Sequence, residues 1–217
     1  MTEDKNIHLI QDVFDHIYLI NVPTQTDRLE AVKAELEEHD IYDKVEIVSA
    51  MTGLDVSDEF KVPEDDKTDG WNNNAVALSL TTARIIKDAK AKGYKNIFIF
   101  EDDAKLTKNF CMLFNNVWES LPKNFDFLHL NANHFKQSKY FKPYLKKITY
   151  AWCCQAYGIS AHMYDIYLEE LEKCLIPIDQ ITGRLHETRD NSYSSSVNIV
   201  YHQENQYSTL RGKIVNY

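Results

Sequence analysis

The chain has 217 residues, with 24 basic and 33 acidic side chains and a formal net charge of −9. This length can bury one sizeable α/β core, so we expect a single domain over residues 1–217, either whole or part of a longer protein. The acidic balance disfavours binding to the phosphates of a nucleic acid. No run approaches the roughly 20 apolar residues of a membrane span, and the N-terminus lacks a signal peptide, so we expect a soluble, cytoplasmic protein.

The first half of the chain has the apolar pattern of an open parallel sheet. We expect buried strands, each followed by a helix or an exposed segment, at 15–21, 45–50 and 97–100. Amphipathic helices are expected at 26–39, 74–92 and 107–121. The opening strand–helix–strand order is the unit of a parallel sheet, and the acid-rich residues 51–69 predict an exposed excursion.

The second half is less regular. We expect strands at 125–130, 149–159 and 197–201, and a helix at 160–174 with Ser160 as its cap. Residues 134–147 alternate lysines with aromatic residues and predict a loop, either a solvated surface segment or a cover over donor phosphates and a sugar ring. The four cysteines have no C-x-x-C spacing, which favours a reducing compartment.

Polar residues follow three of the predicted strands where each strand ends. They are Asn21, residues 49–52, and the run Glu101-Asp102-Asp103. Open parallel sheets bind ligands beyond the carboxyl ends of their strands, so these groups should converge on one cleft.

Consecutive acids at a strand end repel one another unless a positive group neutralises them. A divalent cation carrying a diphosphate would do so, which makes Glu101-Asp102-Asp103 a candidate metal–nucleotide site. The same triplet also fits a solvated turn in which Glu101 or Asp102 caps the following helix. Both interpretations stay open on this motif alone.

The chain resembles glycosyltransferase family 25, which includes lipooligosaccharide galactosyltransferases and collagen-modifying transferases. The resemblance extends in the family's order along most of the sequence. The segments that carry it are 17–21 with Asp27-Arg28, 49–53, Leu78-Ser79, 92–104, 125–130, 156–160, Ile178-Asp179, and Gln203 with Ser208-Thr209. The closest match is 92–104, which reproduces the family's G-Y-x-x-x-[apolar]-E-D-D block. Thr52, Asn72, Asn73 and Leu80 depart from the family's pattern.

The resemblance implies an α/β fold of the GT-A type, with a Rossmann-like, mixed and mostly parallel sheet flanked by helices. It further implies a nucleoside-diphosphate sugar as donor, with UDP as the expected nucleotide, Mn²⁺ or Mg²⁺ as cofactor, and a hydroxyl of a glycan or glycoprotein as acceptor. By this analogy Asp103 is the main metal ligand, and Asp102 contacts the metal or the ribose. His202 is a further candidate contact to the metal or diphosphate, because a neutral imidazole suits Mn²⁺ and the residue lies in a late element expected to close the cleft. The expected donor-binding residues are Asn21, Arg28, Ala50, Ser79, Glu101 and Asp102.

An inverting transfer needs a carboxylate to take the proton of the acceptor hydroxyl, and Asp179 is the candidate base. Asp179 also fits a helix cap after Pro177, and Arg28 also fits a surface pair with Asp27 or Glu30. A structural role fits His202 as well. The residues expected at the acceptor are Asn131, Tyr140, Trp152 and Gln203.

Two functions therefore compete: an active hexosyltransferase and a catalytically silent nucleotide-sugar-binding module of the same fold. The departures from the family's pattern motivate the second. An aspartate-phosphatase of the haloacid dehalogenase type is disfavoured, because its D-x-D spacing requires an acid where Ala104 or Lys105 stands.

Overall fold

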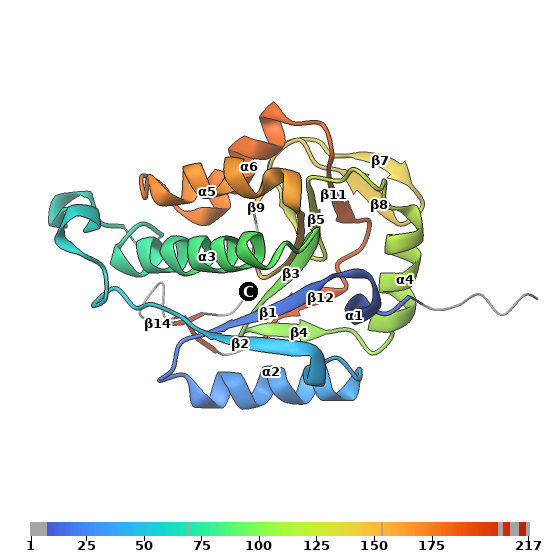
Figure 1. The fold of residues 1–217 in the computed structure, drawn as a ribbon, viewed down its shortest axis with the longest axis horizontal. Helices are drawn as coiled ribbons and strands as arrows, with labels where there is room; N and C mark the ends of the chain where they lie inside the picture. Colours follow the sequence, from blue (N-terminus) through green and yellow to red (C-terminus); the bar gives the residue numbers. More distant parts are fainter. Residues whose placement is uncertain (1–7, 69, 153, 204–205, 209–212, 216–217) are drawn as a thin grey trace, which may run out of the picture.

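The computed structural model describes residues 8–68, 70–152, 154–203, 206–208 and 213–215. Its centre is an eight-stranded sheet in the order β2-β1-β3-β10-β5-β11-β8-β7 (Figure 1). From one edge to the other these strands span Val45–Ser49, His16–Asn21, Asn96–Glu101, Ala156–Ser160, Phe127–His129, Ser192–Ser195, Leu145–Lys147 and Lys139–Lys142. β10 and β8 run against the other strands, so the sheet is mixed and mostly parallel.

Helices cover both faces of the sheet (Figure 1). One face packs against α1 (Ile10–Val13), α2 (Thr26–Glu38) and α4 (Phe110–Ser120), and the other against α3 (Asn73–Lys92), α5 (Tyr164–Glu172) and α6 (Ile178–Thr188). In β3, Phe98 and Phe100 enter the first core, whereas Ile97 and Ile99 enter the second. A strand buried on both faces has no polar side, which is why β3 reads as a continuous apolar run.

Three short antiparallel pairs lie outside the main sheet. They are β4 (Ala104–Leu106) with β12 (Val200–His202), β6 (Asn133–His134) with β9 (Ala151–Trp152), and β13 (Gln206–Ser208) with β14 (Lys213–Val215). Single 3₁₀ turns occur at Tyr42–Lys44, Asp58–Phe60, Glu64–Asp66 and Ala161–Met163.

The strands and helices expected in the first half are confirmed, with shifts of a few residues at their ends. In α3 the side chain of Asn72 caps the N-terminus and Gly93 ends the helix at φ 72°. The left-handed φ is the one that glycine adopts at little cost.

The prediction of a loop over 134–147 was wrong, because that segment contains β7 and β8 at the sheet edge. The helix expected at 160–174 begins as a 3₁₀ turn, and Ser160 makes no capping hydrogen bond. Helix α6 and strand β11 had no counterpart in the sequence prediction.

Within the described ranges, no helix has both the length and the apolar character needed to cross a membrane. Cys111, Cys154 and Cys174 are free thiols, and Cys153 lies outside the described residues.

Candidate functional site

The acidic triplet stands where the central strand β3 ends, beside the end of β1. Glu101 is the last residue of β3 and pairs with Ile20, so Asp102 follows alongside Asn21. Asn21 Nδ2 donates to Asp102 Oδ2 at 2.8 Å. After Asp103 the chain enters a strand, β4, and the triplet therefore does not cap a helix.

Arg28 reaches the triplet from the first turn of α2. Its guanidinium pairs with Asp102, and its Nη2 lies 3.5 Å from Asp103 Oδ2. The Arg28 side chain is only 10 % exposed, so it points into the protein and away from the surface position that a pair with Asp27 or Glu30 would require. The short connection from β1 to α2 thus places one cation beside two carboxylates.

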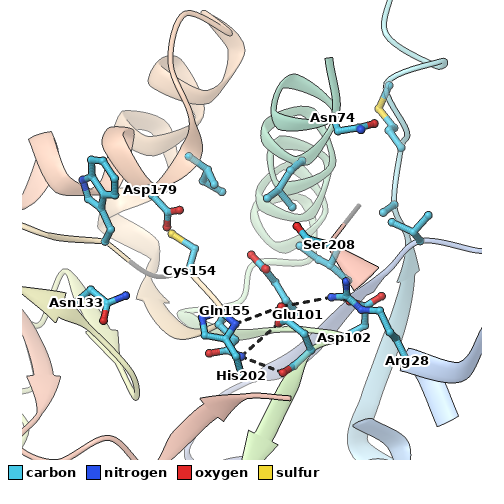
Figure 2. A pocket seen from close by; sticks show the side chains of 18 residues that line it. Arg28, Asn74, Glu101, Asp102, Asn133, Cys154, Gln155, Asp179, His202 and Ser208 are labelled. Atoms are coloured by element: carbon cyan, nitrogen blue, oxygen red, sulfur yellow. Dashed lines mark hydrogen bonds and ion pairs between the residues drawn. The ribbon is translucent and has the colours of Figure 1, made fainter. Parts of the chain in front are cut away.

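Two residues from the second half of the chain approach Asp103. His202 ends β12, which pairs with β4, and its Nδ1 lies 3.3 Å from Asp103 Oδ2. Gln155 Nε2 donates to the main-chain oxygen of Asp103 at 3.0 Å and to Oδ1 at 3.3 Å. Asn131 Nδ2 donates to Gln155 Oε1 at 3.0 Å, which turns the amide nitrogen of Gln155 toward Asp103. Figure 2 shows Gln155 and His202 side by side, next to Glu101 and Asp102.

The pKa values of the two aspartates shift in opposite directions. Burial raises the pKa of Asp103, but the hydrogen bond and charge of His202, together with Arg28 and Gln155, outweigh it, so this pKa lies below its usual value. For Asp102 burial prevails over Arg28, and the pKa is raised. Asp103 is thus the carboxylate that the surroundings hold ionised.

The surroundings of Glu101 favour its protonated form. Burial raises the pKa of Glu101 well above its usual value, and the negative charges of Asp103, Asp179 and Asp102 raise it further. The cluster has more carboxyl groups than cations around it, so an added positive charge would stabilise it.

A cavity of about 240 Å³ opens at this cluster. Asp179, the second residue of α6, lines it together with Asn133 and Cys154 on the side opposite Arg28 and Asp102 (Figure 2). The residues predicted from the sequence that line the cavity are Arg28, Ala50, Glu101, Asp102, Asp103, Trp152, Asp179 and His202. The N-cap of α6 is Pro177, and no side chain makes a capping bond there, so Asp179 is not a cap.

The structure places the other predicted residues elsewhere. Asn21 lies directly behind Asp102, to which it donates. Ser79 is fully buried within α3 and does not line the cavity, because its helix turns that side toward the core. Tyr140, on the edge strand β7, is 74 % exposed and lies outside the cavity lining.

Two predicted acceptor residues support the site from behind. Asn131 is buried and orients Gln155. Gln203 is also buried, and its Nε2 donates to the main-chain oxygen of Ala104 at 3.2 Å. Neither lines the cavity. The Asn131 amide is bonded to Gln155, just before β10, and the Gln203 amide is bonded to Ala104 of β4.

Sequence reasoning missed Gln155, Asn133, Cys154 and Asn74, which also line the cavity. A lone amide in an apolar stretch is the one signal that Gln155 offers. The departures at Asn72 and Asn73 have structural roles: Asn72 caps α3, and Asn73 Oδ1 accepts from Val62 N at 2.9 Å. Asn74 likewise accepts from the main chain of Gly53 at 2.8 Å, so the first turn of α3 anchors the 51–69 excursion.

These residues fit a divalent cation that takes only part of its ligands from the protein. Among the described residues, no three His, Cys, Asp or Glu side chains converge to hold a metal by themselves. Mg²⁺ sites commonly use only one or two carboxylates, with substrate phosphates and water completing the shell. Asp103 and His202 supply such a partial set beside an excess of carboxyl groups.

The sequence model described as glycosyltransferase family 25 (LPS biosynthesis protein) matches residues 14–182. The chain belongs to glycosyltransferase family 25. Its fold is accordingly the GT-A-like arrangement that the sequence predicted, and the protein is a glycosyltransferase. No curated protein sequence matches it significantly.

Several solved structures are distantly similar to this family 25 chain. A glycosyltransferase involved in glycosylation of the major capsid of PBCV-1 has 11 % identity and a TM-score of 0.41, over 72 % of this chain and 64 % of that one. A197 from STIV has 13 % identity and a TM-score of 0.45, over 93 % and 94 % of the two chains. UDP-glucose pyrophosphorylase complexed with UDP-glucose has 9 % identity and a TM-score of 0.47, over 83 % and 90 %. The family assignment rests on the sequence match.

Proposed function

We propose that this chain transfers a hexose from a UDP-sugar to a hydroxyl group of a glycan or glycoprotein, with inversion at the transferred sugar carbon. The observation that carries the proposal is the convergence of Arg28, Asp102, Asp103 and His202 on a cavity whose opposite side holds Asp179. A transferase site needs groups that bind the diphosphate and its cation on one side of the cavity, and a carboxylate that can accept a proton on the other side.

The donor nucleotide is proposed to bind where β1 and β3 end. Arg28 presents a planar guanidinium at the cavity, a geometry suited to diphosphate oxygens. Ala50 also lines the cavity. Its main-chain nitrogen donates to the main-chain oxygen of Asn21 at 2.8 Å, and this bond fixes the chain after β2 against β1. The small side chain of Ala50 leaves room for the nucleotide.

Mn²⁺ or Mg²⁺ is proposed to be held by Asp103 and His202, with Asp102 nearby. When bound, the cation would stabilise the negative charge that develops on the leaving diphosphate. The role of the protein's own groups is to keep Asp103 ionised through Gln155 and His202, as the lowered pKa of Asp103 indicates.

Asp179 is proposed as the general base. It enters the cavity from α6, on the side opposite the donor groups, so it can take the proton of an acceptor hydroxyl that attacks the sugar from the far face (Figure 2). We further propose that residues 1–217 act as one GT-A domain in the cytoplasm, which the free thiols of Cys111, Cys154 and Cys174 support.

Turnover of UDP-sugars with Mn²⁺ tests this function. The wild type should hydrolyse one member of a UDP-sugar panel slowly, and Asp103→Asn should abolish both hydrolysis and Mn²⁺-dependent UDP binding. Asp179→Asn should retain UDP binding but lose transfer to an acceptor by roughly 10²–10⁴-fold, as expected for the loss of a general base. Asp165→Asn, which changes an exposed aspartate on α5, is the matched control.

Two results would reject the proposal. Failure of the wild type to bind or hydrolyse any member of the panel would remove the donor site. Donor binding with no transfer across an acceptor library would instead identify a silent binding module of the same fold.

A further inference from the structure

The cavity changes character beyond the ends of β1 and β2. The lining residues that come from these strand ends and from α3 are Ile20, Val22, Ala50, Met51, Asn74 and Leu78. None of the six carries a charge, and Asn74 is the one with a polar side chain. An apolar wall with a single polar group suits a flat, uncharged ring whose edge carries hydrogen-bonding atoms.

This apolar end is separated from the acidic cluster by the width of two strands. β1 lies between β3 and β2, so the end of β2 is two inter-strand spacings, roughly 10 Å, from the acidic end of β3. The diphosphate is proposed to bind beside Arg28, and a ribose joined to it would place the base near Ala50 and Met51. The apolar end is therefore where the base of the donor fits.

The chain after β2, which forms part of this wall, is fixed by its own backbone. Each main-chain nitrogen from residue 50 to residue 53 donates a hydrogen bond of 2.7–2.9 Å, and the acceptors, in chain order, are Asn21 O, Thr81 Oγ1, Asp55 Oδ2 and Asn74 Oδ1. A wall that is fixed before the ligand arrives loses little entropy on binding. This end of the cavity is therefore rigid enough to discriminate between ligands of similar size.

Thr52 does not supply a polar group to this end of the cavity. Its Oγ1 donates to Asp55 Oδ2 at 2.8 Å, and Thr52 is not among the residues that line the cavity. Thr52 is also one of the departures from the family's pattern. The polar side chain at this end therefore comes from α3 and is that of Asn74.

Gly53 fixes how the Asn74 amide is turned. Asn74 Oδ1 accepts from Gly53 N at 2.8 Å, and a Cβ on Gly53 would lie 2.8 Å from the same oxygen, so the close approach requires a residue without a side chain. Because the amide oxygen faces Gly53, the Nδ2 group is the part of the amide directed away from this loop. Figure 2 shows Asn74 leaving α3 on the side of the cavity that holds Arg28, away from Asp179.

We propose that Asn74 selects the base of the donor nucleotide, by donating a hydrogen bond from Nδ2 to the C4 carbonyl oxygen of uracil. The inference rests on the proposed transferase function and names the residue that determines its donor nucleotide. The C4 oxygen is the carbonyl of uracil farthest from the ribose, so it is the one directed to the end of the cavity beyond β2. Cytosine has an amino group at this position, which would set a donor against the donor of Asn74.

The test is binding of UDP and of CDP to the full chain in the presence of Mn²⁺, measured by isothermal titration calorimetry. The two nucleotides share the ribose and the diphosphate, so the ratio of their Kd values reports on the base alone. The wild type should bind UDP roughly tenfold or more tightly than CDP, because a donor that faces another donor is left without a partner.

Asn74→Asp can still accept from Gly53 N, but it presents an acceptor where Nδ2 stood. The ratio of the CDP Kd to the UDP Kd should therefore fall by roughly tenfold or more in this variant. Asn74→Ala, which removes the donor without adding an acceptor or a charge, should lower the ratio by a smaller factor. Asn73→Asp is the control, because it adds the same charge one residue away, accepts from Val62 N and does not line the cavity, so it should keep the wild-type ratio.

A wild type that binds CDP as tightly as UDP would overturn the proposal, and so would an unchanged Kd ratio in both Asn74 variants. An equal fall of the ratio in Asn73→Asp and Asn74→Asp would also overturn it, because the change would then come from charge at the start of α3. Each of these results leaves the donor site of the proposed function in place. Binding of neither nucleotide by the wild type would instead reject the proposed function, and this inference with it.

Discussion

Arg28 is the cation closest to the carboxylates of the cavity, and Asp102 depends on it. Both side chains are nearly buried, at 10 % and 6 % exposure. Removing one partner of a buried ion pair leaves the other charge uncompensated. The pair therefore links the stability of the fold to the chemistry of the site.

We expect Arg28→Met to lower the free energy of unfolding by about 3 kcal/mol, because Asp102 would then be buried beside Asp103 with no guanidinium. Urea denaturation measures the change. The double variant R28M/D102N should recover part of the loss, which a double-mutant cycle detects. Additive losses would show that the two side chains do not interact energetically.

His186, on α6, makes the stability of the folded chain depend on pH. It is buried against Phe127 and His129, and neither ring nitrogen has a hydrogen-bond partner among the described residues. Burial lowers the pKa of His186 well below its usual value, and the nearby His129 and His134 lower it further. The unfolded chain therefore binds a proton at a pH where the folded chain does not.

Stability should fall as pH falls below about 6.5, the ordinary histidine pKa, because protons then favour the unfolded state. His186→Leu should flatten the dependence of Tm on pH between about pH 8 and about pH 5. His8→Leu, at an exposed site, is the control and should leave the dependence unchanged. An unaltered pH profile in the His186 variant would contradict this explanation.

At the same scale, the acidic triplet and Asn21 could be found because each ends a clear apolar strand, whereas Asp179 was found only through the resemblance to family 25. It could not reveal that Asn131 acts through Gln155, since that depends on a bond between residues 24 positions apart. Ser79 shows the opposite error: a polar residue near a family motif was assigned to the donor, although the helix buries it.

At the scale of elements, strand β10 packs closely against α1. A Cβ on Gly158 would lie 2.6 Å from the Phe14 ring and 3.3 Å from Phe98. Gly158→Ala should therefore destabilise the protein by about 1–3 kcal/mol, the usual cost of overpacking. Gly70→Ala adds the same methyl group where nothing lies within 4 Å and serves as the control in thermal melts. Equal melting temperatures for the two variants would contradict the close packing.

The elements that could be predicted from the sequence are those whose own apolar pattern indicates burial, such as α3 and β3. It missed β7 because an exposed edge strand can alternate lysine with aromatic residues and still pair through its backbone, and it missed β8, which pairs between β7 and β11. It missed β11, Ser192–Ser195, because serines are buried there only through the neighbouring strands. Helix α6 was not predicted because Pro177 and Gly183 are residues that usually interrupt a helical pattern. The close packing of the Tyr150 ring explains why a glycine stands at position 183.

At the scale of the whole molecule, ligand binding should appear as thermal stabilisation. UDP with Mn²⁺, at about 100 times its Kd, should raise Tm by roughly 5–10 °C, because a ligand that binds only the folded chain shifts the unfolding equilibrium. Differential scanning fluorimetry measures the shift. Mn²⁺ alone and UDP alone should each give a much smaller change, and an equal shift for UDP with and without Mn²⁺ would contradict a cation held at Asp103.

The pairing of β12 with β4 joins His202 to Asp103 across 99 positions of sequence. Every strand of the main sheet is complete in the chain by Ser195, whereas β12 follows at Val200–His202. A chain cut after Ser195 would therefore keep all eight strands of the central sheet and lose the imidazole that lies beside Asp103.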